Sequence, residues 1–200
     1  MTDRVRKSRY VPHRAAANLS RAISFASEIG RPLNQMVTLN YGLTYCNEEE
    51  MTAAFRRLLK SFFGKWFTRH PHVRALGGQS AAYAWVAEGR SGHHGVHWLV
   101  ALPPSMLAEF KSRLPVWLER TTGPLVDAKA VHVTGAYRPR GAGDYMLKGL
   151  SPAHARRYRV RAVFQGEVYG KRCGISESLG PTAIRRHGEA VARSGLRIVG

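Results

Sequence analysis

Hydrophobic and polar residues alternate along several short segments of the chain, which is the pattern of strands with one buried face. In the segment QMVTLNYG, Val37, Leu39 and Tyr41 alternate with Thr38 and Asn40. The pattern predicts four strands, at residues 35–42, 81–88, 95–103 and 128–137. Because only a Gly/Ser/His loop separates the second strand from the third, we expect these two strands to form a hairpin.

Helical spacing of apolar residues predicts the elements around these strands. The predicted helices cover residues 14–29, the segment from the N-cap Asn47 to just before Pro71, residues 104–120 and residues 143–150. We expect Pro115 to kink or divide the third helix. The order β-α-β-β-α-β predicts an α+β protein of the split βαβ type (ferredoxin- or RRM-like). Such a fold has one antiparallel sheet with helices on one face and an open second face.

Side chains of alternate parity separate into a covered face and an open face of this sheet. Val96, Trp98 and Val100 form the bulky apolar set of the third strand, which needs to be covered. Polar residues from four separate segments fall on the open face, namely Thr38, Asn40, Glu88, His97, His132 and Thr134. We therefore expect the open face to be the active-site face.

The chain is strongly basic, with 31 Lys and Arg residues against 13 Asp and Glu residues and a formal net charge of +18. Such an excess is commonly balanced by a polyanion, and clustered basic residues favour nucleic acid as the partner. Basic residues are concentrated at both ends. We expect a basic N-terminal helical extension (1–32), a central domain (33–150) and a basic C-terminal extension that binds nucleic acid (151–200).

Cellular location is indicated by what the sequence lacks. Two cysteines, Cys46 and Cys173, are too few and too far apart for a disulfide framework. No segment has the apolar length of a signal peptide or a membrane span. We expect a soluble, cytoplasmic protein that does not contact a membrane.

His97 and Glu88 form a candidate metal site on the open face. Imidazole and carboxylate groups bind divalent ions such as Mg²⁺ or Mn²⁺ and leave coordination positions for phosphate oxygens and water. A bound ion of this kind would polarise a phosphodiester. The alternative is an ordinary strand histidine whose ring nitrogens are satisfied by hydrogen bonds.

Tyr145 and Lys148, in the segment DYMLKG, are a candidate nucleophile and its cationic partner. Residues three apart lie on one side of a helical turn. A phenol has a pKa of about 10, so it needs a nearby ammonium group or metal ion to attack as a phenolate. The alternative is that Tyr145 only packs, because the Tyr-x-x-Lys spacing is common by chance.

Three motifs in order, VTLNY, GVHWLVALPP and YMLKG, resemble those of HUH endonucleases, and more narrowly of rolling-circle replication initiators with a single catalytic tyrosine. The resemblance covers roughly residues 33–150. It implies that Tyr145 attacks a metal-held phosphodiester of single-stranded DNA, leaving a 5′-phosphotyrosine link and a 3′-hydroxyl that primes replication of a plasmid or phage. It also implies that Lys148 takes the position of the family's lysine or second polar group, that His97 is its second histidine and that Glu88 is an additional metal ligand.

The family's first histidine is replaced by Gly95 in this chain. Either His94 takes the role through a bulge at the start of the strand, or Glu88 and His97 suffice, with or without His132. A third possibility is that metal binding has been lost and only DNA binding remains. Of these three interpretations, we favour His94 with a bulge.

Four basic residues outside the catalytic set are expected to contact DNA. They are Arg138 and Arg140, before the tyrosine helix, and Lys171 and Arg172, in the segment YGKRCG. A solvated basic turn is the alternative for the second pair. No Gly-rich phosphate loop of a helicase occurs in the sequence, so a host helicase would be a partner. The competing function is a non-catalytic protein that binds single-stranded nucleic acid on the same fold.

Overall fold

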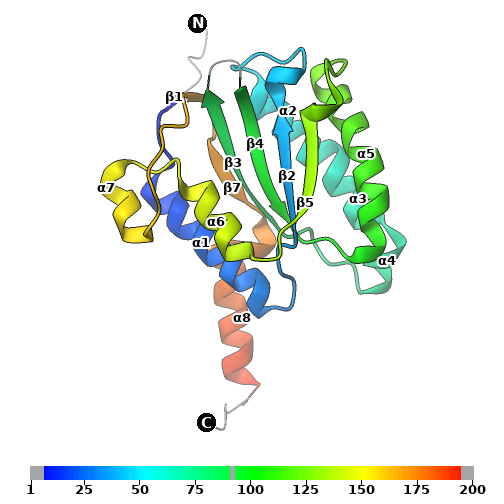
Figure 1. Ribbon diagram of the computed structural model, residues 1–200. Coiled ribbons are helices and arrows are strands. Elements are labelled where there is room, and N and C mark those ends of the chain that lie inside the picture. Colours follow the sequence, from blue (N-terminus) through cyan, green and yellow to red (C-terminus); the bar gives the residue numbers. More distant parts are fainter. Residues whose placement is uncertain (1–6, 91–92, 195–200) are drawn as a thin grey trace, which may run out of the picture.

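A five-stranded antiparallel sheet organises the chain in the computed structural model, which describes residues 7–90 and 93–194. The strands lie in the order β5 (Val131–Gly135), β2 (Gln35–Asn40), β4 (His93–Val100), β3 (Tyr83–Arg90) and β7 (Cys173–Ile175) (Figure 1). The four predicted strands are confirmed, and the protein is a mixed α/β fold. The fifth strand, β7, was not expected from the sequence.

Strand register confirms which side chains share a face. Val37 of β2 pairs with Trp98 of β4 and, on its other side, with Val133 of β5. Trp98 in turn pairs with Trp85 of β3. Because residues paired directly across adjacent strands point to the same side of a sheet, these apolar residues form one continuous buried surface.

Helices α2 (Met51–Arg57), α3 (Gly64–Arg69) and α5 (Pro104–Thr122) cover this apolar face. A π-helical segment, η2 (Leu58–Phe63), joins α2 to α3, and α4 (Pro71–Ala75) follows. Phe63 packs edge-to-face against Trp98 with 4.7 Å between ring centroids. Pro115 lies inside α5, which is one continuous helix rather than a divided one. The prediction for Asn47 was wrong, because its side chain caps a turn before α2 rather than α2 itself.

The second face was predicted to be open, and this was only half correct. Helices α1 (His13–Glu28) and α6 (Pro139–Leu147) pack over the half of this face formed by β7, β3 and β4. The two helices approach so closely that a Cβ on Gly143 would lie 2.6 Å from Cδ1 of Ile23. The half formed by β2 and β5 stays uncovered, since His132 and Thr134 are exposed there (Figure 1).

The two predicted extensions pack on the central unit rather than standing apart from it. Helix α1 belongs to the second face, and β1 (Lys7–Ser8) pairs with β6 (Val168–Tyr169). The C-terminal segment contributes α7 (Pro152–Ala155), the fifth sheet strand β7, and the exposed helix α8 (Pro181–Arg193). The short 3₁₀ turns are η1 (Tyr41–Leu43), η3 (Ala128–Ala130), η4 (Arg156–Tyr158) and η5 (Glu177–Leu179). Within the described residues, no helix combines the length and apolarity needed to cross a membrane.

Candidate functional site

Four of the predicted site residues meet on the second face of the sheet, where α6 ends against β3 and β4. His97 Nε2 lies 3.1 Å from Oε1 of Glu88, and Nζ of Lys148 lies 3.1 Å from the same oxygen. The ring of Tyr145 stands edge-on to that of His97, with 5.1 Å between centroids. Residues separated by up to 60 positions (Glu88 to Lys148) thus form one cluster.

Sheet register places the imidazole and the carboxylate side by side. His97 pairs with Thr38 of β2, while Glu88 of β3 lies two residue pairs along, opposite Gly95, and so on the same face as His97. Thr38 Oγ1 is 3.2 Å from Nδ1 of His97, so the two ring nitrogens face Thr38 and Glu88. Contacts on both sides hold the imidazole in one orientation.

The end of α6 places the phenol and the ammonium group over this pair. Lys148 immediately follows the helix, and its Nζ lies 3.6 Å from the centroid of the Tyr145 ring. A cation in this position is attracted by the ring face. Tyr145 is 48% exposed, so its ring is accessible while one edge contacts the buried cluster. Tyr145 is therefore accessible to solvent and also in contact with His97 and Lys148.

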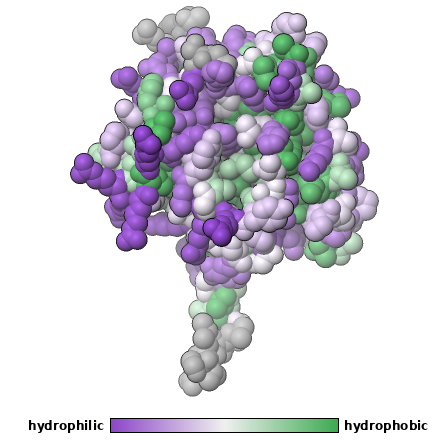
Figure 2. All heavy atoms as spheres, in the orientation of Figure 1, coloured by the Kyte–Doolittle hydropathy of each residue, from purple (hydrophilic) through white to green (hydrophobic). Residues whose placement is uncertain are grey.

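The site opens into a hollow of about 570 Å³ between α6 and the uncovered half of the sheet. Its walls include Thr38, His97, Thr134, Tyr137 and Tyr145, with Arg138 at the rim. Figure 2 shows this side of the molecule, where a paler, less polar centre is surrounded by hydrophilic side chains. The hollow is wide and shallow, as expected of a surface that accepts a polymer.

The carboxylate of Glu88 is negatively charged in this cluster. Burial raises its pKa, but the hydrogen bond from His97 and the positive charges of His97 and Lys148 outweigh this effect. The net result is a pKa below the usual value. A partly buried anion is therefore held between two nitrogen groups, and it fixes the position of Lys148 beside Tyr145.

His94 does not join this cluster. It has the parity of Val96 and Trp98 and points to the opposite face of the sheet, where its Nε2 bonds to the backbone oxygen of Cys46 at 3.0 Å. The expected bulge is absent, since pairing between β3 and β4 is regular from His93 to Val100. The prediction that His94 lies beside His97 was therefore wrong.

Gly95 has the parity of His97, but no side chain fits at this position. A Cβ on Gly95 would lie 2.7 Å from the backbone oxygen of Leu39 on the neighbouring strand. The close approach of β2 thus explains why a glycine stands where the resembling family has its first histidine. His132 does not replace it, because Thr38 lies between His132 and His97 across β2.

The donor atoms in place are one imidazole and one carboxylate. Among the described residues, no group of three His, Cys, Asp or Glu side chains is arranged to hold a metal ion. Mg²⁺ is often bound through one or two protein groups, with substrate phosphates and water as the other ligands. The pair of His97 and Glu88 fits an ion of that kind, although Lys148 contacts the same carboxylate.

The predicted DNA-contacting residues differ in their accessibility. Arg138, Arg140 and Lys171 are exposed. Arg172 is buried, and its guanidinium donates hydrogen bonds to three backbone oxygens, at 2.7 Å (Ser8), 3.0 Å (Gln165) and 2.8 Å (Gly166). The expectation that Arg172 contacts DNA was wrong, because its side chain links three segments of the chain.

Tyr137 was missed by the sequence analysis. It is 96% exposed and forms part of the wall of the hollow beside Arg138. The one indication in the sequence is that this aromatic residue directly precedes Arg138, since aromatic and basic residues together are typical of nucleic-acid contacts.

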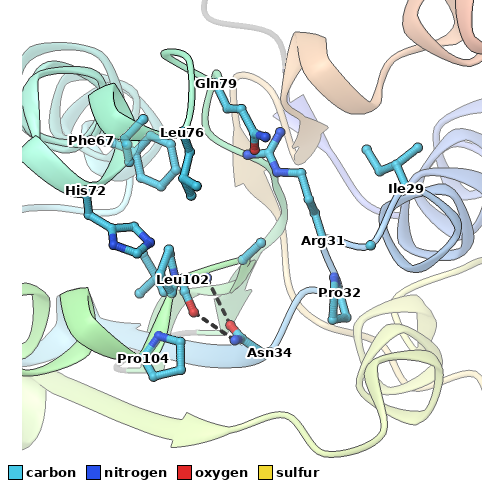
Figure 3. A pocket seen from close by; sticks show the side chains of 14 residues that line it. Ile29, Arg31, Pro32, Asn34, Phe67, His72, Leu76, Gln79, Leu102 and Pro104 are labelled. Carbon is cyan, nitrogen blue, oxygen red and sulfur yellow. Dashed lines mark hydrogen bonds between the residues drawn. The ribbon is translucent and has the colours of Figure 1, made fainter.

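A second hollow, of about 410 Å³, lies just beyond the C-terminal end of β4, beside Asn34 and Leu102 (Figure 3). Asn34 donates to the backbone oxygen of Leu102 (2.8 Å) and accepts from its N–H (2.9 Å), and Arg31 donates to the backbone oxygen of Ser80. Because these polar groups already hydrogen-bond to the backbone, we assign them a structural role rather than a ligand-binding one.

Comparison with known proteins adds no further assignment to this site. The interpretation therefore depends on the geometry of Tyr145, Lys148, His97 and Glu88. No protein-family model matches the chain, and no curated protein matches it at a significant level.

Proposed function

We propose that the protein nicks single-stranded DNA by covalent catalysis at Tyr145. The observation that supports this best is the position of the Tyr145 ring, which lies against His97 and under the ammonium group of Lys148. The phenolic oxygen would attack phosphorus, and the bond from phosphorus to the 3′ oxygen would break. The phenol loses a proton and the leaving 3′ oxygen gains one, giving a 5′-phosphotyrosine and a free 3′-hydroxyl.

The residues around Tyr145 supply what this reaction needs. Lys148 stabilises the phenolate and the negative charge on the phosphate, since a cation near a developing anion lowers the barrier. His97 and Glu88 would hold a Mg²⁺ or Mn²⁺ ion, which supplies Lewis-acid polarisation of the phosphate when bound. His94 is not part of this metal site, because it lies on the other face.

The order of the sheet strands supports the split βαβ fold that this proposal implies. Leaving out β7, the strands β5-β2-β4-β3 have the order fourth, first, third and second, all antiparallel. This is compatible with a split βαβ core in an endonuclease of the HUH type. The departures are the two helices on the second face and the glycine at position 95.

The wider role proposed here is initiation of rolling-circle replication of a plasmid or phage in the cytoplasm. The 3′-hydroxyl left by the nick would prime synthesis, and a host helicase would separate the strands. Single-stranded or hairpin DNA would lie along the hollow, with Arg138, Arg140 and Lys171 contacting its phosphates.

A second candidate function is binding of single-stranded nucleic acid without catalysis. The observation that favours it is the lack of space at Gly95, which leaves two metal donors instead of three. Both candidates predict DNA binding, and only the first predicts a covalent product.

Formation of a covalent adduct separates the two candidates. The wild type, Tyr145→Phe and the control Tyr45→Phe would be incubated with labelled hairpin and single-stranded replication-origin DNA and Mn²⁺, then denatured. Tyr45 is 74% exposed and does not line the hollow. We expect an adduct with the wild type and the control, and none with Tyr145→Phe, which still binds DNA. An adduct with Tyr145→Phe would refute the assignment, and DNA binding without any adduct would favour the second candidate.

A further inference from the structure

Two exposed aromatic rings lie together at a distance from the tyrosine hollow. Tyr10 and Phe164 are 38% and 49% exposed, and their rings meet edge-to-face with 6.1 Å between centroids and an interplanar angle of 69°. They come from segments that are 154 positions apart in the sequence. Large aromatic side chains that stay accessible in a folded protein often mark a binding surface.

Backbone hydrogen bonds fix this aromatic pair beside the residues that follow α6. The N–H of Val11 donates to the oxygen of Gly149 at 2.9 Å, and the N–H of Val163 donates to the oxygen of Lys148 at 2.8 Å. Val11 and Val163, which adjoin Tyr10 and Phe164 in the sequence, therefore flank the chain at Lys148 and Gly149. Figure 1 shows both segments on the α6 and β3 side of the molecule.

The same C-terminal segment is also joined to β3 next to Glu88. Gly89 donates to the oxygen of Gln165 at 2.8 Å, and the backbones of Gly89 and Gly166 form a bridge. A Cβ on either glycine would overlap the backbone of the other segment, so both positions need glycine. The aromatic pair is thus held in a fixed relation to the site through Lys148 and β3.

The segments that carry the aromatic pair are rich in positive charge. The guanidinium of Arg9 lies 5.8 Å from the centroid of the Phe164 ring, and Nζ of Lys7 lies 4.5 Å from that of Tyr169. Four further arginines in the preceding segment are exposed: Arg156, Arg157, Arg159 and Arg161. Glu167 contacts both Lys7 and Arg9 at 3.7 Å, and one carboxylate leaves a large excess of positive charge.

We propose that Tyr10 and Phe164 form a base-stacking subsite for single-stranded DNA that also reaches the Tyr145 site. This inference rests on the proposed function and adds to it the place where unpaired bases are held. Aromatic rings in a basic groove bind single strands because every base has a face that stacks, while the cations bind the phosphates. In a duplex the bases are stacked on one another, so the subsite would select unpaired DNA.

Binding of fluorescent oligonucleotides tests the subsite directly. The proteins would be the wild type, the double variant Tyr10→Ala/Phe164→Ala, the double variant Tyr10→Trp/Phe164→Trp, and the control Tyr45→Ala. We expect the double alanine variant to bind an oligo-dT strand about tenfold to hundredfold more weakly, which is the usual effect of losing base stacking. The tryptophan variant and the control should bind within about threefold of the wild type.

An abasic strand of the same length separates stacking from other effects. The wild type should bind it as weakly as the double alanine variant binds oligo-dT, and the alanine substitutions should not weaken abasic binding further. Equal weakening on both strands, or unchanged binding of oligo-dT, would overturn the subsite. If the wild type forms the Tyr145 adduct while the alanine variant binds oligo-dT normally, the subsite alone is refuted. A wild type that binds no single-stranded DNA would refute the proposed function together with it.

Discussion

Lys148 and Glu88 form a partly buried ion pair in which Nζ lies 3.1 Å from Oε1, the same carboxylate oxygen that contacts His97. Their side chains are only 19% and 14% exposed. A divalent ion at His97 and Glu88 would therefore share its carboxylate with an ammonium group. Repulsion between the two positive groups makes Lys148 a competitor of the metal ion.

Removing this competitor should strengthen metal binding. We expect Lys148→Met to bind Mn²⁺ at least about tenfold more tightly than the wild type, because the positive charge beside the carboxylate is lost. Titration calorimetry with Mn²⁺ alone measures this without any DNA. Glu88→Gln serves as the control and should lose Mn²⁺ binding. Equal or weaker binding by Lys148→Met would contradict a metal site at these two donors.

Stability should depend on pH through Glu88. Its pKa in the folded protein is below the usual value of 4.5 for a free glutamate, so it contributes stability that is present above about pH 4.5 and is lost as the pH falls through the folded pKa. Urea unfolding of the wild type and Glu88→Gln from about pH 7 to about pH 3 would show this, because carboxylates titrate within that range. We expect the wild type to be more stable at pH 7 and the difference to shrink toward pH 3. A difference that is constant across this range would show that Glu88 is not stabilised as an anion.

A histidine placed at position 95 should not be tolerated. We expect Gly95→His to lower the free energy of unfolding by about 1–3 kcal/mol, because its Cβ would press on the backbone oxygen of Leu39. Gly95→Ala should be destabilised as well, since the clash begins at the Cβ. Gly188→Ala is the matched control, because a Cβ there meets nothing within 4 Å. If Gly95→His were as stable as the wild type and bound Mn²⁺ more tightly, the steric explanation would be wrong.

The neighbouring residues Lys171 and Arg172 should respond differently to substitution. Arg172→Met removes three hydrogen bonds to backbone oxygens, so we expect a loss of at least about 3 kcal/mol in urea unfolding. Lys171→Met should leave stability unchanged and lower the salt slope of single-strand binding by about 0.7, the value for one phosphate contact. A stable Arg172→Met protein with a reduced salt slope would reverse these two roles.

Strand alternation was sufficient to place His97 and Glu88 on one face, because a period of two fixes the side of each side chain once the strands are known. The spacing of Tyr145 and Lys148 similarly predicted that both lie on one side of a turn. Their meeting with His97 depended on how α6 packs on the sheet, for which only the motif order gave an indication.

Other features depend on contacts that leave no periodic pattern. The strand β7 has three residues with a glycine at its centre, too short for alternation to be recognised. The spacing of α1 showed an apolar side but not which face of the sheet it covers. Arg172 and Lys171 are both basic, and only the tertiary structure shows that one side chain is buried.

The bridge between Gly89 and Gly166 restricts how this chain could be recombined with another. The strand that carries Glu88 accepts the later segment only where neither partner has a side chain. A chimaera with a foreign segment after residue 151 would need glycine at the position of Gly166 to keep the bridge to Gly89. The two halves of the sequence are therefore expected to be inherited as a matched pair.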